Sequence, residues 1–245
     1  LLVPVVGIYF ARLNDVVGLA GDDAWYVLLA QSLATGQGYQ LLNWPTLGIL
    51  PSYPPAFPFL LSLCLRVAPL AAENFWLLKL VSVVAMLGTG TVTYFYAKQM
   101  ALLPQALNVL VALAVVLMPA FVFLATATAM SECVFTLAQL LTVMVVEKAL
   151  RKGPRQMTWH WWVGAGMLGS WAFLTRSIAV SLLMAIVLYL LKERHFNAAV
   201  IFTGSAVLCI APWIFYTRAN ATSAELKRAH GGNIVYTYGD QLWMK

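Results

Sequence analysis

The sequence predicts an all-α protein that crosses a membrane several times. Of the 245 residues, 62% are hydrophobic and 10% are charged, and the mean hydropathy is +0.81. A soluble domain has about 25% charged residues. Long apolar stretches recur along the chain, and a helix satisfies its own backbone hydrogen bonds in lipid. We therefore expect a polytopic membrane protein that is surrounded by membrane lipid.

Seven apolar windows approach the length of a membrane span. They cover 1–13, 75–97, 104–124, 130–147, 159–175, 178–191 and 197–217. The window 178–191 is short and needs residues from its flanks. The first window would rise about 20 Å as a helix, against a hydrocarbon core of about 30 Å. We therefore expect about seven transmembrane helices within 1–217, with the first already under way at residue 1.

The connection 14–74 is too polar and too rich in Pro and Gly to be one more span, and two of its segments are predicted to be helical. In 22–35, with Asp22 as N-cap and Gly36 as stop, four apolar residues share one face: Trp25, Leu28, Leu29 and Leu33. A second helix over 59–67 follows Tyr53-Pro54-Pro55. Both are expected to lie along the membrane surface.

The basic residues predict the orientation. They follow the second, fourth and sixth windows: Lys98; Lys148, Arg151, Lys152 and Arg155; Lys192 and Arg194. Because positive charge is enriched in cytoplasmic connections, this side is predicted to be the cytoplasm. The same placement accounts for the net charge of +6 without a nucleic-acid partner. The connection 14–74 then lies outside, as does 218–245, either as a loop or as the start of a further C-terminal part.

Two adjacent acids, Asp22 and Asp23, open the predicted helix 22–35 on the outer side. Acids near lipid are costly and are candidates for function. One carboxylate could act as a general base while Asp23 helps to hold a divalent metal ion. The alternative is that Asp22 caps a surface helix and Asp23 favours its dipole. The pair alone does not decide between these interpretations.

Glu132 is the only formally charged residue between Gln105 and Glu147. Ser131 could cap the helix that follows, which would place Glu132 in the first turn, where the helix dipole favours an anion. Alternatively, Glu132 is a second acid that faces the same outer cavity as Asp22 and acts as a catalytic group or a metal ligand. Asp23 and Glu132 are the two metal ligands that the sequence suggests.

Two arginines lie at the outer ends of apolar windows. Arg176 follows Leu174-Thr175, and Arg218 ends the last window. A guanidinium can hold a phosphate or pyrophosphate through two hydrogen bonds. Snorkelling to lipid headgroups or anchoring of a span end is the alternative, and that alternative is stronger for Arg218. Both remain candidate phosphate-binding residues.

The order of these features resembles the GT-C membrane glycosyltransferases, most closely the protein O-mannosyltransferase and aminoarabinose-transferase branch. That branch has an acidic pair before an aromatic-rich helix and then a Pro-Pro element. The similar elements here, in order, are Asp22-Asp23-Ala24-Trp25-Tyr26, Tyr53-Pro54-Pro55, Ser131-Glu132, Leu174-Thr175-Arg176, and Pro212-Trp213 followed by Arg218 and Asn220. Asp23 departs from the Glu that many relatives have, and Arg218 lies farther from Pro-Trp than expected.

The resemblance implies seven spans and two juxtamembrane helices, a polyprenyl-phosphate-linked sugar as donor, and inversion at the sugar carbon. Asp22 would be the base with Asp23 assisting, Glu132 a second acidic site, and Arg176 the ligand of the lipid phosphate. The site would face the periplasm from the inner membrane. The sugar and the acceptor are left open.

Two other functions remain as alternatives. A non-catalytic membrane subunit could retain this fold within a larger complex, and it predicts that Asp22→Asn and Glu132→Gln leave function intact. A lipid or solute transporter is less favoured, because the predicted spans lack buried charged pairs and paired helices broken by Gly or Pro.

Overall fold

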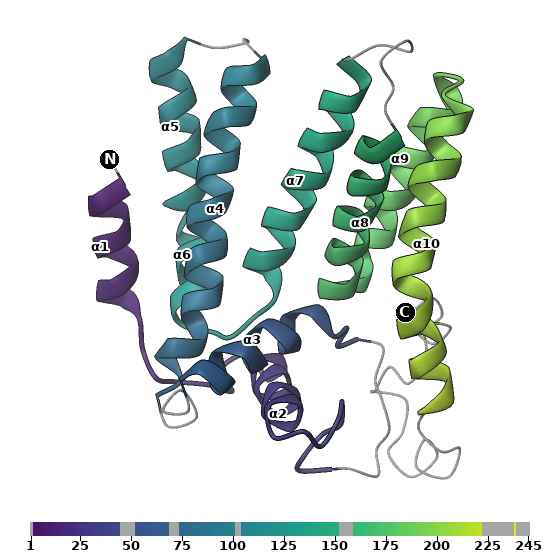
Figure 1. Cartoon of the computed structure of the whole chain (residues 1–245). Coiled ribbons are helices and arrows are strands. Elements are labelled where there is room, and N and C mark those ends of the chain that lie inside the picture. Colours follow the sequence, from purple (N-terminus) through teal and green to yellow (C-terminus); the bar gives the residue numbers. More distant parts are fainter. Residues whose placement is uncertain are drawn as a thin grey trace, which may run out of the picture.

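The chain forms a bundle of helices closed at one end by two crossing helices (Figure 1). The computed structural model describes residues 2–44, 52–68, 74–100, 104–151, 159–221 and 238. In chain order the elements are α1 (Leu2–Arg12), α2 (Asp22–Ala34), α3 (Ala56–Val67), α4 (Trp76–Met100), α5 (Gln105–Val116), α6 (Pro119–Thr126), α7 (Glu132–Arg151), α8 (Trp159–Thr175), the 3-10 turn η4 (Ser177–Ala179), α9 (Val180–Lys192) and α10 (Phe196–Ala219).

Each of the seven predicted windows contains helix. Three helices are long and apolar enough to cross a membrane: α4, α7 and α10. The pair α5 and α6 makes a fourth candidate if it is one span with a break. Ser177–Lys192 is a shorter apolar helix, as the short sixth window predicts. Among the described residues, length and composition thus support three or four spans of an all-α polytopic membrane protein.

The break between α5 and α6 bends the chain by 49°. Pro119 is the first residue of α6, and Met118 before it has φ −58° and ψ 123°. Proline has no N–H to donate and disfavours helical ψ in the residue before it. One apolar window at 104–124 therefore becomes two helices.

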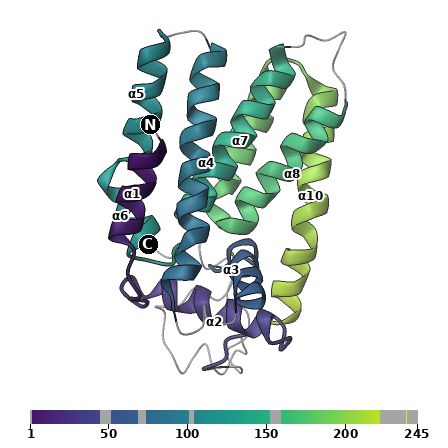
Figure 2. The same ribbon diagram turned by 60° about the vertical axis from the view of Figure 1, so that its left-hand side comes forward.

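The two ends of the bundle differ. Figures 1 and 2 show α2 and α3 lying across the end where α4 and α7 begin and where α8 and α10 finish. The opposite end holds the last turns of α4, α7 and α9, which carry Lys98, Lys148, Arg151 and Lys192. The predicted grouping of basic residues on one side is therefore confirmed for these four, while Lys152 and Arg155 lie outside the described residues.

Helix α2 corrects two predictions. Its N-cap is Gly21, with φ 76°, and Asp22 is the first helical residue, so Asp22 is not the cap.

The helix α2 also buries two faces rather than one. Leu29, with Trp25, Leu28 and Leu33 beside it, belongs to one apolar cluster, whereas the opposite face packs into another through Tyr26, Val27 and Ala30. The predicted stop is right, because Gly36 has φ 76° directly after the C-cap Thr35.

Close packing of α8 against α10 depends on small residues. Ala165, Gly166 and Gly169 of α8 are buried, as are Ala199 and Ala206 of α10. A Cβ atom added at Gly166 would lie 2.6 Å from the carbonyl oxygen of Phe202. Small residues let membrane helices approach until their backbones touch, which is the main source of attraction between helices in lipid.

We predict that Gly166→Ala lowers the stability of the protein in detergent by about 1–3 kcal/mol, because the new methyl group overpacks the α8–α10 contact. Gly164→Ala is the control on the same helix, since a Cβ there meets nothing within 4 Å. Thermal unfolding followed by circular dichroism measures both. Equal midpoints for the two variants would contradict the packing argument.

Lys79 of α4 holds the end of the bundle that α2 and α3 cover. Its side chain is fully buried. The ammonium lies 2.8 Å from the Asn14 carbonyl, 2.6 Å from Asn14 Oδ1, 2.7 Å from the Val16 carbonyl and 3.1 Å from the Ala127 carbonyl. One cation therefore joins α4 to the α1–α2 connection and to the link before α7.

We predict that Lys79→Met lowers the unfolding midpoint in detergent by at least about 5 °C, because each buried acceptor left without a donor costs about 1–3 kcal/mol. Lys98→Met removes a charge from an exposed position of the same helix and should leave the midpoint unchanged. A Lys79→Met protein as stable as wild type would show that the four oxygens find other donors.

Candidate functional site

An ion pair joins two of the residues that the sequence singled out. Glu132 is the first residue of α7, and Arg176 lies between α8 and η4. Arg176 Nη1 pairs with Glu132 Oε1, and the two side chains are 34% and 24% exposed. The second oxygen of Glu132, Oε2, is buried without a hydrogen-bond partner in the described structure. Arg176 thus presents a fork of further N–H donors beside an acid that holds it in place.

Tyr26 connects this ion pair to α2. Its hydroxyl is hydrogen-bonded to the Ser131 hydroxyl, with 3.1 Å between the oxygens. The same hydroxyl interacts electrostatically with Arg176, Glu132 and Asp22. Burial is the largest effect on Tyr26 and raises its pKa, while Ser131 and Arg176 act in the opposite direction. The structure therefore gathers Asp22, Glu132 and Arg176 around one buried tyrosine.

Asp22 is exposed and held by a second tyrosine. The Tyr53 hydroxyl donates to Asp22 Oδ1 at 2.8 Å. Tyr53 also packs edge-to-face on Tyr26, with ring centroids 5.3 Å apart. A continuous path of contacts thus runs from Asp22 through Tyr53, Tyr26 and Ser131 to the start of α7. Segments more than 100 residues apart in the sequence meet here, since 105 residues separate Tyr26 from Ser131.

Asp23 has different surroundings from Asp22. Its side chain is fully buried, its Oδ1 accepts from the Ala24 N–H at 3.0 Å, and its Oδ2 has no hydrogen-bond partner among the described residues. Its charge acts on Lys79. The carboxylate lies inside the bundle, and the two adjacent acids are not equivalent.

The described residues do not form a complete divalent-metal site at Asp23 and Glu132. In the described parts of the chain, no three His, Cys, Asp or Glu side chains converge where a metal ion could bind. One oxygen of Glu132 is paired with Arg176. A hard divalent cation takes at least about six oxygen ligands, which for Mg²⁺ include only one or two carboxylates beside waters and substrate phosphates, so these two acids stay predicted ligands.

Arg218 is not part of the ion-pair network. It lies exposed in the last turn of α10, and no described residue pairs with it. This exposed position agrees with the alternative that Arg218 anchors the end of a span. The role of Arg218 as a phosphate ligand stays a prediction.

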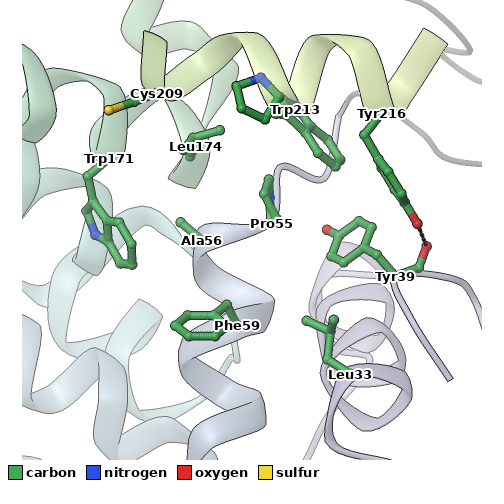
Figure 3. Close-up of a pocket in the computed structure, with 11 residues that line it drawn as sticks. Leu33, Tyr39, Pro55, Ala56, Phe59, Trp171, Leu174, Cys209, Trp213 and Tyr216 are labelled. Carbon is green, nitrogen blue, oxygen red and sulfur yellow. Dashed lines mark hydrogen bonds between the residues drawn. The ribbon is translucent and has the colours of Figure 1, made fainter. Parts of the chain in front are cut away.

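An apolar pocket of about 450 Å³ lies between α2, α3, α8 and α10 (Figure 3). Trp171 and Leu174 line it from α8, within five residues of Arg176. Tyr39 packs edge-to-face on Trp213 across the pocket wall, and Tyr39 donates to the Tyr53 carbonyl at 2.6 Å. The full lining is Leu33, Tyr39, Pro55, Ala56, Phe59, Trp171, Leu174, Cys209, Pro212, Trp213 and Tyr216.

The sequence did not assign roles to Tyr26, Tyr53 or Lys79. Both tyrosines lie in motifs that the sequence showed: Tyr26 is three residues after Asp23, and Tyr53 stands directly before Pro-Pro. The sequence signal for a role of these tyrosines is therefore their position close to Asp22 and to the start of α3. The residues that the two tyrosines contact are distant in sequence, so the spacing of residues along the chain could not identify these contacts.

Membrane-spanning helices with two helices across one end are the arrangement that the resemblance to the GT-C type predicts. A family model of dolichyl-phosphate-mannose-protein mannosyltransferase matches residues 52–216, about two thirds of the chain. The chain belongs to this family, which is part of the GT-C superfamily. The membership supports a membrane mannosyltransferase-like glycosyltransferase. No curated protein and no solved structure matches the chain significantly.

The matched range contains Tyr53, Lys79, Glu132 and Arg176. Asp22, Asp23 and Arg218 lie outside it. The link between Asp22 and the matched part is thus the hydrogen bond from Tyr53.

Proposed function

We propose that the protein transfers a sugar from a polyprenyl-phosphate donor to an acceptor hydroxyl on the outer, periplasmic side of the membrane. The observation that carries this proposal is the path of contacts from Asp22 through Tyr53, Tyr26 and Ser131 to the start of α7, where Glu132 pairs with Arg176. This path lies at the end of the bundle away from the basic connections. Family membership supplies the lipid-linked sugar. The positive-inside rule supports the outer location.

Arg176 is proposed to hold the donor phosphate. Its guanidinium has five N–H donors, so it can bind phosphate oxygens while one donor stays on Glu132. Glu132 then orients the fork. The leaving phosphate gains negative charge as the sugar departs, and a fixed cation beside it stabilises that charge.

The apolar pocket is proposed to take the first isoprenoid units of the donor. Its walls are aliphatic and aromatic, and its α8 lining residues, Trp171 and Leu174, come shortly before Arg176 in the chain. Burial of apolar surface contributes about 25 cal/mol per Å². A lipid phosphate could thus place its chain in the pocket and its headgroup on the arginine.

Asp22 is proposed as the general base. The acceptor oxygen attacks the anomeric carbon, and its proton passes to the Asp22 carboxylate. A new carbon–oxygen bond forms as the bond from the sugar carbon to the phosphate oxygen breaks. The phosphate oxygen keeps the electron pair, and polyprenyl phosphate leaves. Attack from the side opposite the leaving group inverts the sugar carbon.

The donor site is tested by lipids that stay with the purified protein. We expect wild type to retain polyprenyl phosphate and Arg176→Gln to lose it, as measured by mass spectrometry of the extracted lipids. Arg12→Gln, at the end of α1 on the same side of the bundle, is the control and should retain the lipid. Ordinary phospholipids alone in every sample would favour a non-catalytic subunit that keeps the fold.

The base is tested by release of polyprenyl phosphate from polyprenyl-phosphate mannose in membranes that contain the protein. Asp22→Asn should lower the rate by about 100-fold or more, the usual contribution of a general base. It should not lower retention of the donor lipid. Glu193→Gln, exposed at the opposite end of the bundle, should keep the full rate. Full activity of Asp22→Asn would remove Asp22 from the mechanism.

A further inference from the structure

Tyr53 is fixed from several directions at the point where it meets Asp22. Its ring stacks on Trp25, with centroids 5.7 Å apart and planes 5° apart. Tyr26 packs against it at an interplanar angle of 83°. Its carbonyl accepts from the Tyr39 hydroxyl at 2.6 Å. Pro54 after it disfavours helical backbone at Tyr53. Ring and backbone are therefore both held before any substrate binds.

The fixed ring delivers its hydroxyl to one oxygen of Asp22. The hydroxyl donates to Oδ1 at 2.8 Å, and no described residue bonds to Oδ2. A carboxylate has two oxygens that can accept a proton, and free rotation would exchange them. The hydrogen bond to Oδ1 prevents that exchange and leaves Oδ2 for an incoming group.

The Tyr53 hydroxyl remains a donor over the working range of pH. Burial, followed by the hydrogen bond to Asp22, raises the pKa of Tyr53 above its ordinary value. A neutral phenol beside a carboxylate can only donate to it. The hydrogen bond between Tyr53 and Asp22 therefore has a fixed direction, from the phenol to the carboxylate.

We propose that Tyr53 is a positioning residue that fixes Asp22 with Oδ2 toward the acceptor hydroxyl. The inference rests on the proposed function, in which Asp22 is the base. It goes further because it assigns the proton to one oxygen and gives the Tyr-Pro-Pro element a task. The aromatic ring alone would serve packing, whereas only the hydroxyl can orient the carboxylate.

The experiment compares Tyr53→Phe, Asp22→Asn and the double variant in the polyprenyl-phosphate release assay. Loss of a hydrogen bond to a charged group corresponds to about a 10-fold effect. We expect Tyr53→Phe to lower kcat by about 10-fold, with the KM for polyprenyl-phosphate mannose and the unfolding midpoint unchanged. The double variant should be no slower than Asp22→Asn, because the hydroxyl acts only through Asp22.

Tyr189→Phe, which removes an exposed hydroxyl of α9, is the matched control and should keep the wild-type kcat. A wild-type kcat for Tyr53→Phe, while Asp22→Asn is inactive, would overturn the positioning role and leave the proposed function standing. A further loss in the double variant would also overturn it, since Tyr53 would then act apart from Asp22. No release by wild type would overturn both.

Discussion

The arrangement of the site depends on the buried ammonium of Lys79. A cation in an apolar interior must keep its acceptors, because exposing it to lipid or leaving it unpaired is costly. The acceptors come from Asn14 and Val16, before α2, and from Ala127, before α7. The same two segments lead into Asp22 and Glu132. Lys79 therefore joins the two segments that lead into the proposed base and the acid of the ion pair.

Contacts of two tyrosines add to the connection that Lys79 makes between these segments. Tyr26 and Tyr53 fill the space between α2, α3 and α7, and Tyr26 also packs on Phe57 with centroids 5.1 Å apart. Their apolar rings belong to the core, while their hydroxyls reach Ser131 and Asp22. Tyrosine is suited to this position because one side chain supplies both apolar contact and a hydrogen-bond donor. Polar groups of the site are thus connected through side chains that also belong to the apolar core.

Apolar windows and basic residues predicted the helices and their common ends, because hydropathy and charge are properties of local sequence. The prediction of Asp22 as N-cap was wrong, since the turn at Gly21 takes a positive φ and places the acid one residue inside α2. One-sided burial of α2 was wrong as well, because a helical pattern cannot show that two separate apolar clusters cover the helix. Contacts such as that of Tyr26 with Ser131 join residues 105 positions apart, so the spacing of residues along the chain could not predict them.

Helix geometry separates the tasks of the two adjacent acids. Successive residues of an α-helix point about 100° apart, which gives Asp22 and Asp23 different surroundings. Asp22 is exposed and bonded to Tyr53, whereas Asp23 is fully buried and its charge acts on Lys79. A buried carboxylate near a buried ammonium offsets part of the cost of both charges. This placement favours a structural task for Asp23 beside Lys79, whereas Asp22 remains the proposed base.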